Sequence, residues 1–567
     1  MSTAGVNDHL EASLKEREAS YDAAVKLLYI PMTKTYHTAL TPESHPYAHC
    51  IYSSAAYALD LLESGRQDRA ERAIGIVRTL LPLQDAKEDS PTFGVWPYFW
   101  EEPLARMKEP DWNYADFVGK KLVLMLKRHG ERMDGELKRE LAAAIERACR
   151  AIVKRDVGPS YTNIAVMGAF VTLAGGETIG RETYVEYGRN RLQRLYDFTL
   201  RLGTFVEFNS PTYTPIAIEE LDHICRESSD PEANRLAGEL LFRAWRMAAE
   251  HYHPRTGEWA GPHSRAYAPM LNKDGAAARW FAGIREERID ARSPRCPDTL
   301  LPYFRSEEER YFRCPIFDED ETGYQSYATT YMNESFCLGS FSKEMMWHQR
   351  RNLIAYADNG GQPAYVQLRF LKDGKDFSSA VFTGAQQRGD IVFGLNMALD
   401  YGDWHPVLDP VNGIFHAADL RIRFEIGGYT DGIEIRTEDE LGYDAAAIIG
   451  EQTVRVKQLA ACSDLGMPRM AISRSGQKGT LGIDYVIYEG PSRAFNLHEW
   501  SCAAWAFWFA MSDSAERPQA GSLYRDGMLS AWLDRSGKRT EIAIPARPDR
   551  ISRLYRDNRV SFADEEA

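Results

Sequence analysis

The stretch GELKRELAAAIERACRAIVKRD, residues 135–156, decides the fold of the first half of the chain. Its apolar residues Leu137, Leu141 and Ile145 recur every four positions, and the segment also carries Lys, Arg and Glu residues off that spacing. This spacing places the apolar side chains on one face of a helix and the charges on the other. Segments with the same period continue to about residue 252, separated by short breaks that contain Gly, Pro or Asp. Many helices joined by short turns predict antiparallel helix hairpins, arranged as an (α/α) toroid. The alternative, an α-solenoid, would need a fixed sequence repeat, and none is found.

The pattern changes after about residue 290. In YVQLRFL, residues 365–371, and RIRFEI, residues 421–426, apolar and polar residues alternate, and Gly- and Asp-rich turns separate such segments. A period of two with frequent turns predicts antiparallel strands that bury one face. We therefore expect an α+β multidomain chain, with a toroid over residues 1–290 and an antiparallel β-sandwich over residues 291–567.

Composition limits the classes of function. The chain has 567 residues and a net charge of −14, which argues against nucleic acid as a partner and means that an anionic substrate needs a local basic site. The eight cysteines show no CxxC spacing and are expected to be free thiols. Because the N-terminus lacks an apolar leader and no apolar run could span a bilayer, we expect a cytoplasmic protein without membrane contact. The sequence leaves open whether it is a monomer or a dimer.

The segment GEWAGPHSRAY, residues 257–267, is the first candidate for an active site. It places an imidazole (His263), a guanidinium (Arg265) and a phenol (Tyr267) within five residues, beside Trp259 and a Gly-Pro pair. A lone histidine is usually structural, but a His, Arg and Tyr together in a loop can supply a base, an anion clamp and an acid.

Four other segments are unusually polar or aromatic. They are FGVWPYFWEEP at residues 93–103, PDWNYADF at 110–117, TFVEFNSPTYTPIAIEELDH at 204–223 and the WHQRR run at 347–351. The first is either a platform for stacking sugars or a packed loop, and the last is either a lid over a cleft or a seam between domains. In addition, Asn163 begins an otherwise apolar helix, where its amide is either a cap or a ligand contact.

Several motifs are missing from the chain. It contains no GxGxxG after a strand, no GxxxxGK[ST], no HExxH and no GxSxG, which disfavours nucleotide binding, zinc peptidases and α/β-hydrolases. His405, His416 and His498 are scattered without the spacing of metal ligands. We therefore expect no metal and no cofactor.

Asn163 at a helix start, the NSPTY segment ending at Tyr213 and the HSRAY segment beginning at His263 resemble the heparinase II/III-like and alginate-lyase-like polysaccharide lyases. In architecture the resemblance covers nearly the whole chain. Many members place a His directly after the Asn, whereas this chain has Ile164, so the role of the imidazole falls to His263.

The resemblance implies a lyase that cleaves a uronic-acid-containing poly- or oligosaccharide by β-elimination. Asn163 and Arg265 would neutralise the substrate carboxylate, His263 would be the base, and Tyr213 or Tyr267 the acid. If the eliminated groups are syn, one tyrosine can take both roles. The residues expected to contact the substrate are Trp96, Tyr98, Trp100, Asn113, Asn209, Trp259, His348 and Arg350.

Two other functions stay open at this point. A glycoside hydrolase on the same toroid would use two carboxylates as acid and base or nucleophile. The carboxylates available for this are Glu207, Glu219, Asp222, Asp111 and Asp116. A carbohydrate-binding protein without turnover would need none of them.

Overall fold

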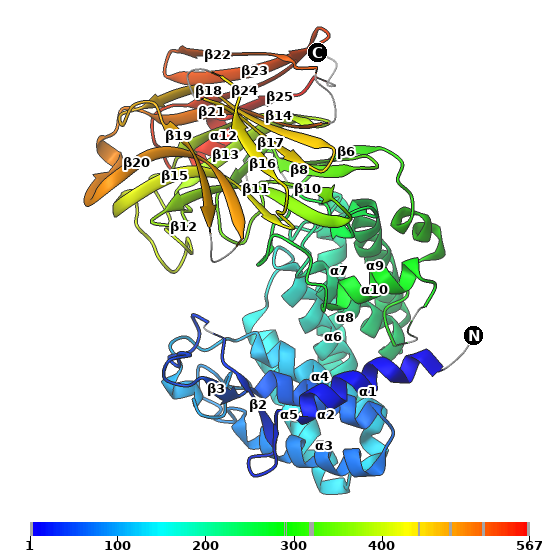
Figure 1. The fold of residues 1–567 in the computed structure, drawn as a ribbon. Coiled ribbons are helices and arrows are strands. Elements are labelled where there is room, and N and C mark those ends of the chain that lie inside the picture. Colours follow the sequence, from blue (N-terminus) through cyan, green and yellow to red (C-terminus); the bar gives the residue numbers. More distant parts are fainter. Residues whose placement is uncertain are drawn as a thin grey trace. The chain divides into compact units, whose positions relative to one another are not determined.

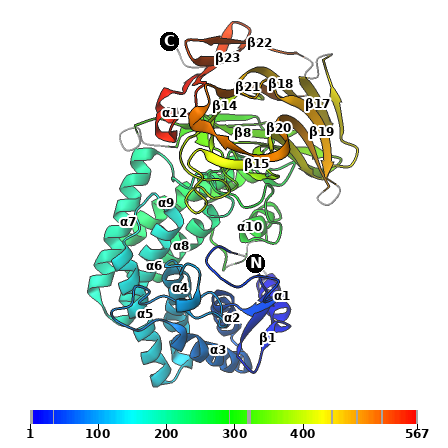
Figure 2. The same cartoon turned by 90° about the vertical axis from the view of Figure 1, so that its left-hand side faces the viewer.

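The computed structural model describes residues 4–563 apart from 34, 289, 291, 317–322, 440–442, 476–478 and 513–515. The chain forms two compact units. The helical unit comprises Met1–Thr199, Pro215–Ala244 and Glu286–Cys296, and the sheet unit comprises Leu200–Thr214, Trp245–Arg285 and Pro297–Ala567. Figures 1 and 2 show the order of the elements in each unit.

Helices make up most of the helical unit (Figure 2). Neighbours in sequence pack on one another: α2 contacts α3 and α4, and α5 contacts α4 and α6. The α-helices among the described residues are α1 (Ala4–Glu18), α2 (Ile51–Glu63), α3 (Gln67–Leu80), α4 (Tyr114–His129), α5 (Gly135–Arg155), α6 (Thr162–Ile179), α7 (Glu182–Leu202), α8 (Thr214–Glu227), α9 (Pro231–His251), α10 (Ala276–Arg285) and α12 (Ile551–Asp557). A three-stranded sheet lies between α1 and α2 in the sequence, and its strands are β1 (Tyr21–Asp22), β2 (Leu27–Pro31) and β3 (Tyr47–His49).

Helix α5 follows the expectation from its sequence. Leu137, Leu141 and Ile145 are all buried, as their spacing predicts. The helix begins where the Asp134 side chain accepts a hydrogen bond of 2.8 Å from the Leu137 N–H, and it ends where Asp156 adopts a left-handed conformation. Periodicity and caps together therefore fix both ends of this helix.

Three stacked antiparallel sheets form the body of the sheet unit (Figure 1). One apolar core fills the space between the nine-stranded and seven-stranded sheets, and a second lies between the seven-stranded and four-stranded sheets. The nine-stranded sheet contains β6 (Arg310–Pro315), β7 (Tyr327–Met332), β8 (Phe336–Phe341), β10 (Leu353–Asn359), β11 (Gln362–Lys372), β12 (Lys375–Asp376), β15 (Ile414–Gly428), β19 (Arg469–Ser475) and β20 (Thr480–Asn496). The seven-stranded sheet contains β9 (Lys343–Met345), β13 (Ala380–Gln387), β14 (Asp390–Met397), β16 (Glu434–Thr437), β17 (Asp444–Ile449), β18 (Gln452–Ser463) and β21 (Ala503–Ser512). The four-stranded sheet contains β22 (Gln519–Arg525), β23 (Met528–Arg535), β24 (Lys538–Pro545) and β25 (Arg559–Ser561).

Strand β11 shows how the period of two builds this unit. Val366 and Leu368 pair in register with Ile426 and Phe424 of β15, and all four face the core between the two large sheets. The alternate residues of β11 point to the other side of the nine-stranded sheet, which we call its outer face. The predicted α+β class and the order of helices before antiparallel sheets are confirmed.

Two segments that precede residue 290 belong to the sheet unit. Residues 200–214 and 245–285 are compact with the sheets, although their composition led us to place them with the helices. Long helices lead into both segments: α7 ends at Leu202 and α9 ends at His251. A domain boundary drawn from composition therefore groups these segments with the helices, whereas their contacts group them with the sheets.

Candidate functional site

The loop that follows β5 (Glu258–Trp259) lies directly on the outer face of the nine-stranded sheet. Glycine makes this approach feasible, since a Cβ at Gly339 of β8 would come within 1.9 Å of the Gly261 carbonyl. The Thr330 hydroxyl of β7 donates to the same carbonyl at 2.7 Å. The loop backbone is therefore held at a fixed height above the sheet, and the side chains that follow it are held with it.

Asn209 is the centre of this arrangement. It adopts a left-handed conformation with φ of 48°, which asparagine tolerates better than most residues. Its amide nitrogen donates to the carbonyls of Ala260 and Pro262 at 2.7 and 3.0 Å, and its amide oxygen accepts from the Trp259 indole at 2.5 Å. Both ends of the buried amide are thus engaged. Asn209 holds the loop in place, in contrast to the ligand-binding role expected for it.

His263 lies in the interior beside Asn209. Its Nδ1 donates to the Asn209 carbonyl at 2.7 Å, and its backbone exchanges hydrogen bonds with Arg351. Burial lowers the pKa of His263 to about 4, against the opposing effect of the bond to Asn209, so its imidazole is neutral at pH 7. The side chain is 1% exposed. A proton acceptor for a bound sugar must reach that sugar, so this position favours a structural role over the expected role of base.

Arg265 extends from the same loop into a half-buried polar cluster. Its Nε donates to the Gln349 side chain at 2.9 Å, its Nη2 donates to the Tyr213 hydroxyl at 3.1 Å, and its Nη1 lies 3.4 Å from a Glu207 carboxylate oxygen. The guanidinium also lies over the rings of Tyr213 and Trp347, with its central carbon 4.6 and 5.3 Å from their centres. These contacts fix the plane of the cation against a phenol.

Two tyrosines complete the cluster. The hydroxyl oxygens of Tyr213 and Tyr267 are 2.8 Å apart, and Tyr267 is 57% exposed. Ser210 positions the first of them by accepting from the Tyr213 N–H at 2.9 Å while donating to the Arg265 carbonyl. A phenol pair that is open to solvent and touched by a guanidinium can hold, accept and return a proton.

The WHQRR run borders this cluster from the sheet side. Gln349 reaches Arg265, and the His348 Nδ1 donates to the Trp404 carbonyl at 2.8 Å. Arg350 is bound to the carboxylate of Glu344, which is itself buried. The guanidinium of Arg350 is therefore bound within the protein, whereas the sequence led us to expect it to contact the substrate.

The remaining predicted residues belong to the helical unit. Asn163, the second residue of α6, is fully buried. Trp96 is also fully buried, and its indole donates to the Leu80 carbonyl, so its ring belongs to the core and not to a sugar platform. The Tyr98 hydroxyl donates to Asp111, whereas the ring of Trp100 is 46% exposed. Trp259 of the sheet unit resembles Trp96 in being buried with its N–H bonded.

Asn113 precedes α4 in the helical unit. Its side-chain oxygen accepts a hydrogen bond from Arg155. Four of the five residues expected to be catalytic thus lie in the sheet unit, where Tyr213, Arg265 and Tyr267 form direct contacts and His263 supports their loop. Sequence reasoning did not find Gln349 as the partner of Arg265, or Asn209 as the anchor. The polarity of the WHQRR run was the available signal for the first.

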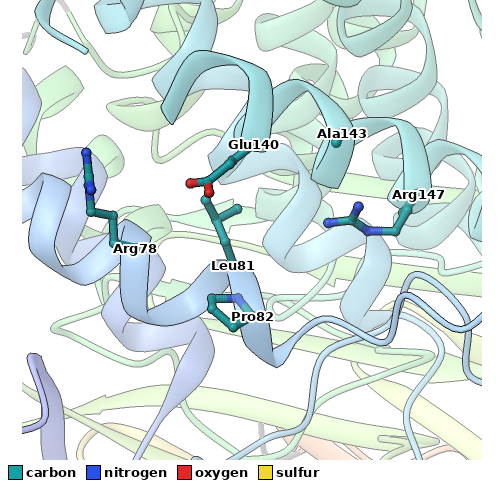
Figure 3. A pocket seen from close by; sticks show the side chains of 6 residues that line it. All are labelled: Arg78, Leu81, Pro82, Glu140, Ala143 and Arg147. Carbon is teal, nitrogen blue, oxygen red and sulfur yellow. The ribbon is translucent and has the colours of Figure 1, made fainter. Parts of the chain in front are cut away.

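The helical unit contains a hollow of about 390 Å³ (Figure 3). Its lining includes Arg78, Glu140 and Arg147, from α3 and α5. Arg78 is paired with Asp134 at 2.7 Å and Arg147 donates to Gln84, so the arginines serve helix packing. In the described part of the chain, no cluster of three or more His, Cys, Asp or Glu side chains is placed to bind a metal ion. No helix among these residues is long and apolar enough to cross a membrane.

The fold and the cluster define an α+β chain in which a helical unit is combined with a three-sheet unit that carries a Tyr–Arg–Tyr site. A family model described as "Domain of unknown function (DUF8769)" matches residues 7–295, and the chain belongs to this family. No curated protein matches the sequence.

Solved structures show similarity over most of the chain. Heparinase III is 10% identical with a TM-score of 0.44, covering 96% of this chain and 91% of its own. A chondroitin AC lyase of Streptomyces coelicolor A3, solved in complex with chondroitin sulphate, is 12% identical with a TM-score of 0.44, covering 96% and 88%. A xanthan lyase of Paenibacillus is 10% identical with a TM-score of 0.43, covering 96% and 63%. Two of these three structures are named as lyases and the third as a heparinase.

Proposed function

We propose that this chain is a polysaccharide lyase that cleaves a uronic-acid-containing glycan by β-elimination, with Tyr213, Arg265 and Tyr267 as its proton-transfer site. The observation that carries the proposal is the geometry of the two phenols and the guanidinium. The Tyr213 oxygen lies 2.8 Å from the Tyr267 oxygen and 3.1 Å from the Arg265 Nη2. A hydrogen bond from a cation stabilises a phenolate relative to a phenol, which makes Tyr213 the better base.

The proposed reaction takes one proton from C5 and delivers one proton to O4, and the electron pair of the C4–O4 bond leaves with O4. The Tyr213 phenolate removes the proton from C5 of the uronate, and the electron pair left on C5 forms the C4–C5 double bond as the C4–O4 bond breaks. The leaving O4 oxygen takes a proton from Tyr267, or from Tyr213 itself if the groups are syn. The hydrogen bond between the two hydroxyls lets the proton pass from one to the other, so that the site returns to its starting state.

The C5 proton is weakly acidic as long as the neighbouring carboxylate keeps its full charge. Arg265 supplies the local cation that a chain of net charge −14 needs for an anionic substrate. His263 and Asn209 position the loop, because their polar groups are bonded within the protein.

The test is incubation with oligomers and polymers of mannuronate, galacturonate and glucuronate. A lyase yields an unsaturated product that absorbs in the near ultraviolet, a hydrolase yields reducing ends without that absorption, and a binding protein yields neither. Tyr213→Phe should lower kcat by about a thousandfold, since it removes a group that acts in the transition state. Tyr524→Phe makes the same change at an exposed phenol on β22 and is the control.

Formation of reducing ends without the ultraviolet product would refute the proposal in favour of hydrolysis. Full activity in both Tyr213→Phe and Tyr267→Phe would also refute it.

A further inference from the structure

The loop between β14 and β15 carries an exposed tryptophan close to the Tyr–Arg–Tyr site. Trp404 is 43% exposed, and Tyr401, Val407 and Leu408 of the same loop are exposed as well. Large apolar side chains grouped on a surface usually mark a place where something binds.

The protein fixes the backbone of this loop closely. The Ser378 N–H and the Ser379 hydroxyl donate to the carbonyls of Asp403 and Gly402, each at 2.9 Å. Lys372 of β11 forms an ion pair of 2.9 Å with the Asp403 carboxylate. The backbone that leads into Trp404 is therefore held before any ligand arrives, and binding to its ring would cost little ordering of the chain.

His348 supports the indole from one side. The two rings stack with centres 4.2 Å apart and planes 15° from parallel, and the His348 Nδ1 donates to the Trp404 carbonyl at 2.8 Å. Burial lowers the pKa of His348, so the ring in this stack is neutral at pH 7. Since the imidazole covers one face of the indole, the exposed surface of Trp404 lies on its other side.

A continuous series of contacts joins this stack to the reaction site. The His348 Nε2 is 3.3 Å from the Gln349 side-chain nitrogen, and the Gln349 oxygen accepts from Arg265 at 2.9 Å. Arg265 in turn bonds Tyr213. Five consecutive side chains thus connect an exposed indole to the group proposed as base, and all of them belong to the sheet unit.

We propose that Trp404, backed by His348, is the stacking platform for a pyranose ring that lies beyond the two rings joined by the bond that is cleaved. This inference rests on the proposed function and deepens it, because it assigns a subsite to the same site. One face of a pyranose presents C–H groups that pack on an aromatic ring, while its hydroxyls and carboxylate point outward to polar partners. The platform binds the substrate and positions it, and takes no part in proton transfer.

The experiment measures cleavage and binding separately for uronate disaccharides and hexasaccharides. In Trp404→Ala, KM for the hexasaccharide should rise about tenfold, with a smaller change in kcat and an unchanged pH profile. For the disaccharide, which consists only of the reacting uronate and the sugar that leaves on O4, KM should stay within about twofold of the unsubstituted chain. Trp404→Phe should recover most of the loss, and Tyr524→Ala on β22 is the control for removal of an exposed ring.

Calorimetry with saturated hexasaccharide on Tyr213→Phe, with and without Trp404→Ala, tests the platform without turnover. Weaker binding in the double variant supports the platform even if no glycan is cleaved, in which case the lyase proposal alone fails. Cleavage with an unchanged KM in Trp404→Ala, or an equal effect on disaccharide and hexasaccharide, overturns the platform and leaves the lyase standing. If the unsubstituted chain binds no oligomer, both proposals are refuted.

Discussion

Each unit of this molecule holds a carboxylate beside a cation, and the two pairs differ in what surrounds them. In the helical unit, Lys120 of α4 and Glu220 of α8 form an ion pair whose side chains are 2% and 0% exposed. In the sheet unit, Arg265 and Glu207 lie 3.4 Å apart, and Arg265 also bonds a phenol that solvent can reach. Complete burial makes the first pair part of the scaffold, whereas partial exposure leaves the second able to act on a ligand.

The titration of the buried pair supports this difference. Burial disfavours both charges, but Glu220 raises the pKa of Lys120, and Lys120 with His223 lowers the pKa of the Glu220 carboxyl to about 2. Each charge is retained because of the other. Loss of one partner would leave an unpaired charge in the interior. The free-energy cost of that unpaired charge is much larger than the stabilisation that the intact pair provides.

The largest effect is therefore expected for Lys120→Met. It should lower the free energy of unfolding by about 3 to 5 kcal/mol, because Glu220 would be left buried without a partner. Urea unfolding measures this, and Lys120→Met combined with Glu220→Leu should recover most of the loss. Arg235→Ala, which breaks an exposed pair with Glu232 and Glu239, is the control and should cost less than about 0.5 kcal/mol. A similar loss of unfolding free energy in Lys120→Met and Arg235→Ala would contradict the distinction between buried and exposed pairs.

Protonation of His263 at acid pH is expected to have a smaller effect on the free energy of unfolding. Its pKa is about 4 in the folded chain and about 6.5 when unfolded, so the unfolded chain binds the proton more tightly. The stability that comes from the neutral imidazole is complete above pH 6.5 and is lost as the pH falls toward 4. Between pH 7 and pH 5 this amounts to about 2 kcal/mol.

His263→Asn keeps a donor toward the Asn209 carbonyl and removes the titration. Its stability should fall less than that of the unsubstituted chain over the same pH range, as measured by thermal or urea unfolding. An identical pH dependence would show that His263 is not the group responsible. His251 and His253 are buried nearby, with pKa values lowered by burial to about 3 and 4, and they add to the acid sensitivity of both chains.

The smallest effect concerns the partly exposed pair of Arg265 and Glu207. It is a shift of the pH dependence of activity by about one pH unit, equivalent to about 1.4 kcal/mol. Arg265→Ala should move the pH at which activity appears upward, because the Tyr213 phenolate loses its cation. Glu207→Gln should move this pH downward, because the charge of Arg265 is then no longer offset by a carboxylate and stabilises the phenolate more strongly. The measurement is kcat/KM against pH for both variants. Shifts in the same direction, or no shift in either, would argue against Tyr213 as base.

Local rules predicted most of the fold. The spacing of Leu137, Leu141 and Ile145 and the Asp134 cap are encoded within a single helix, so α5 could be read directly. The alternation in β11 likewise indicated which side chains face the core. In both cases the decisive neighbours lie within a few residues of one another.

The site could be predicted only in part, because its geometry depends on contacts across long stretches of chain. The HSRAY loop and Tyr213 stood out by residue type, but Gln349 is 84 residues from the arginine it binds. The indoles of Trp96 and Trp259 could stack on a sugar as well as any other, and only the structure shows that both are buried, with their N–H groups bonded within the protein. Composition cannot distinguish these cases.

The contact between Gly261 and Gly339 also bears on modularity. The family model ends at residue 295, yet the strand that supports the loop and the glutamine that orients Arg265 both come later in the chain. The matched region therefore carries Tyr213, Arg265 and Tyr267 without the surface that arranges them. Recombination or truncation at its end would separate reactive groups from their support, so the two parts are expected to be inherited and expressed as one piece.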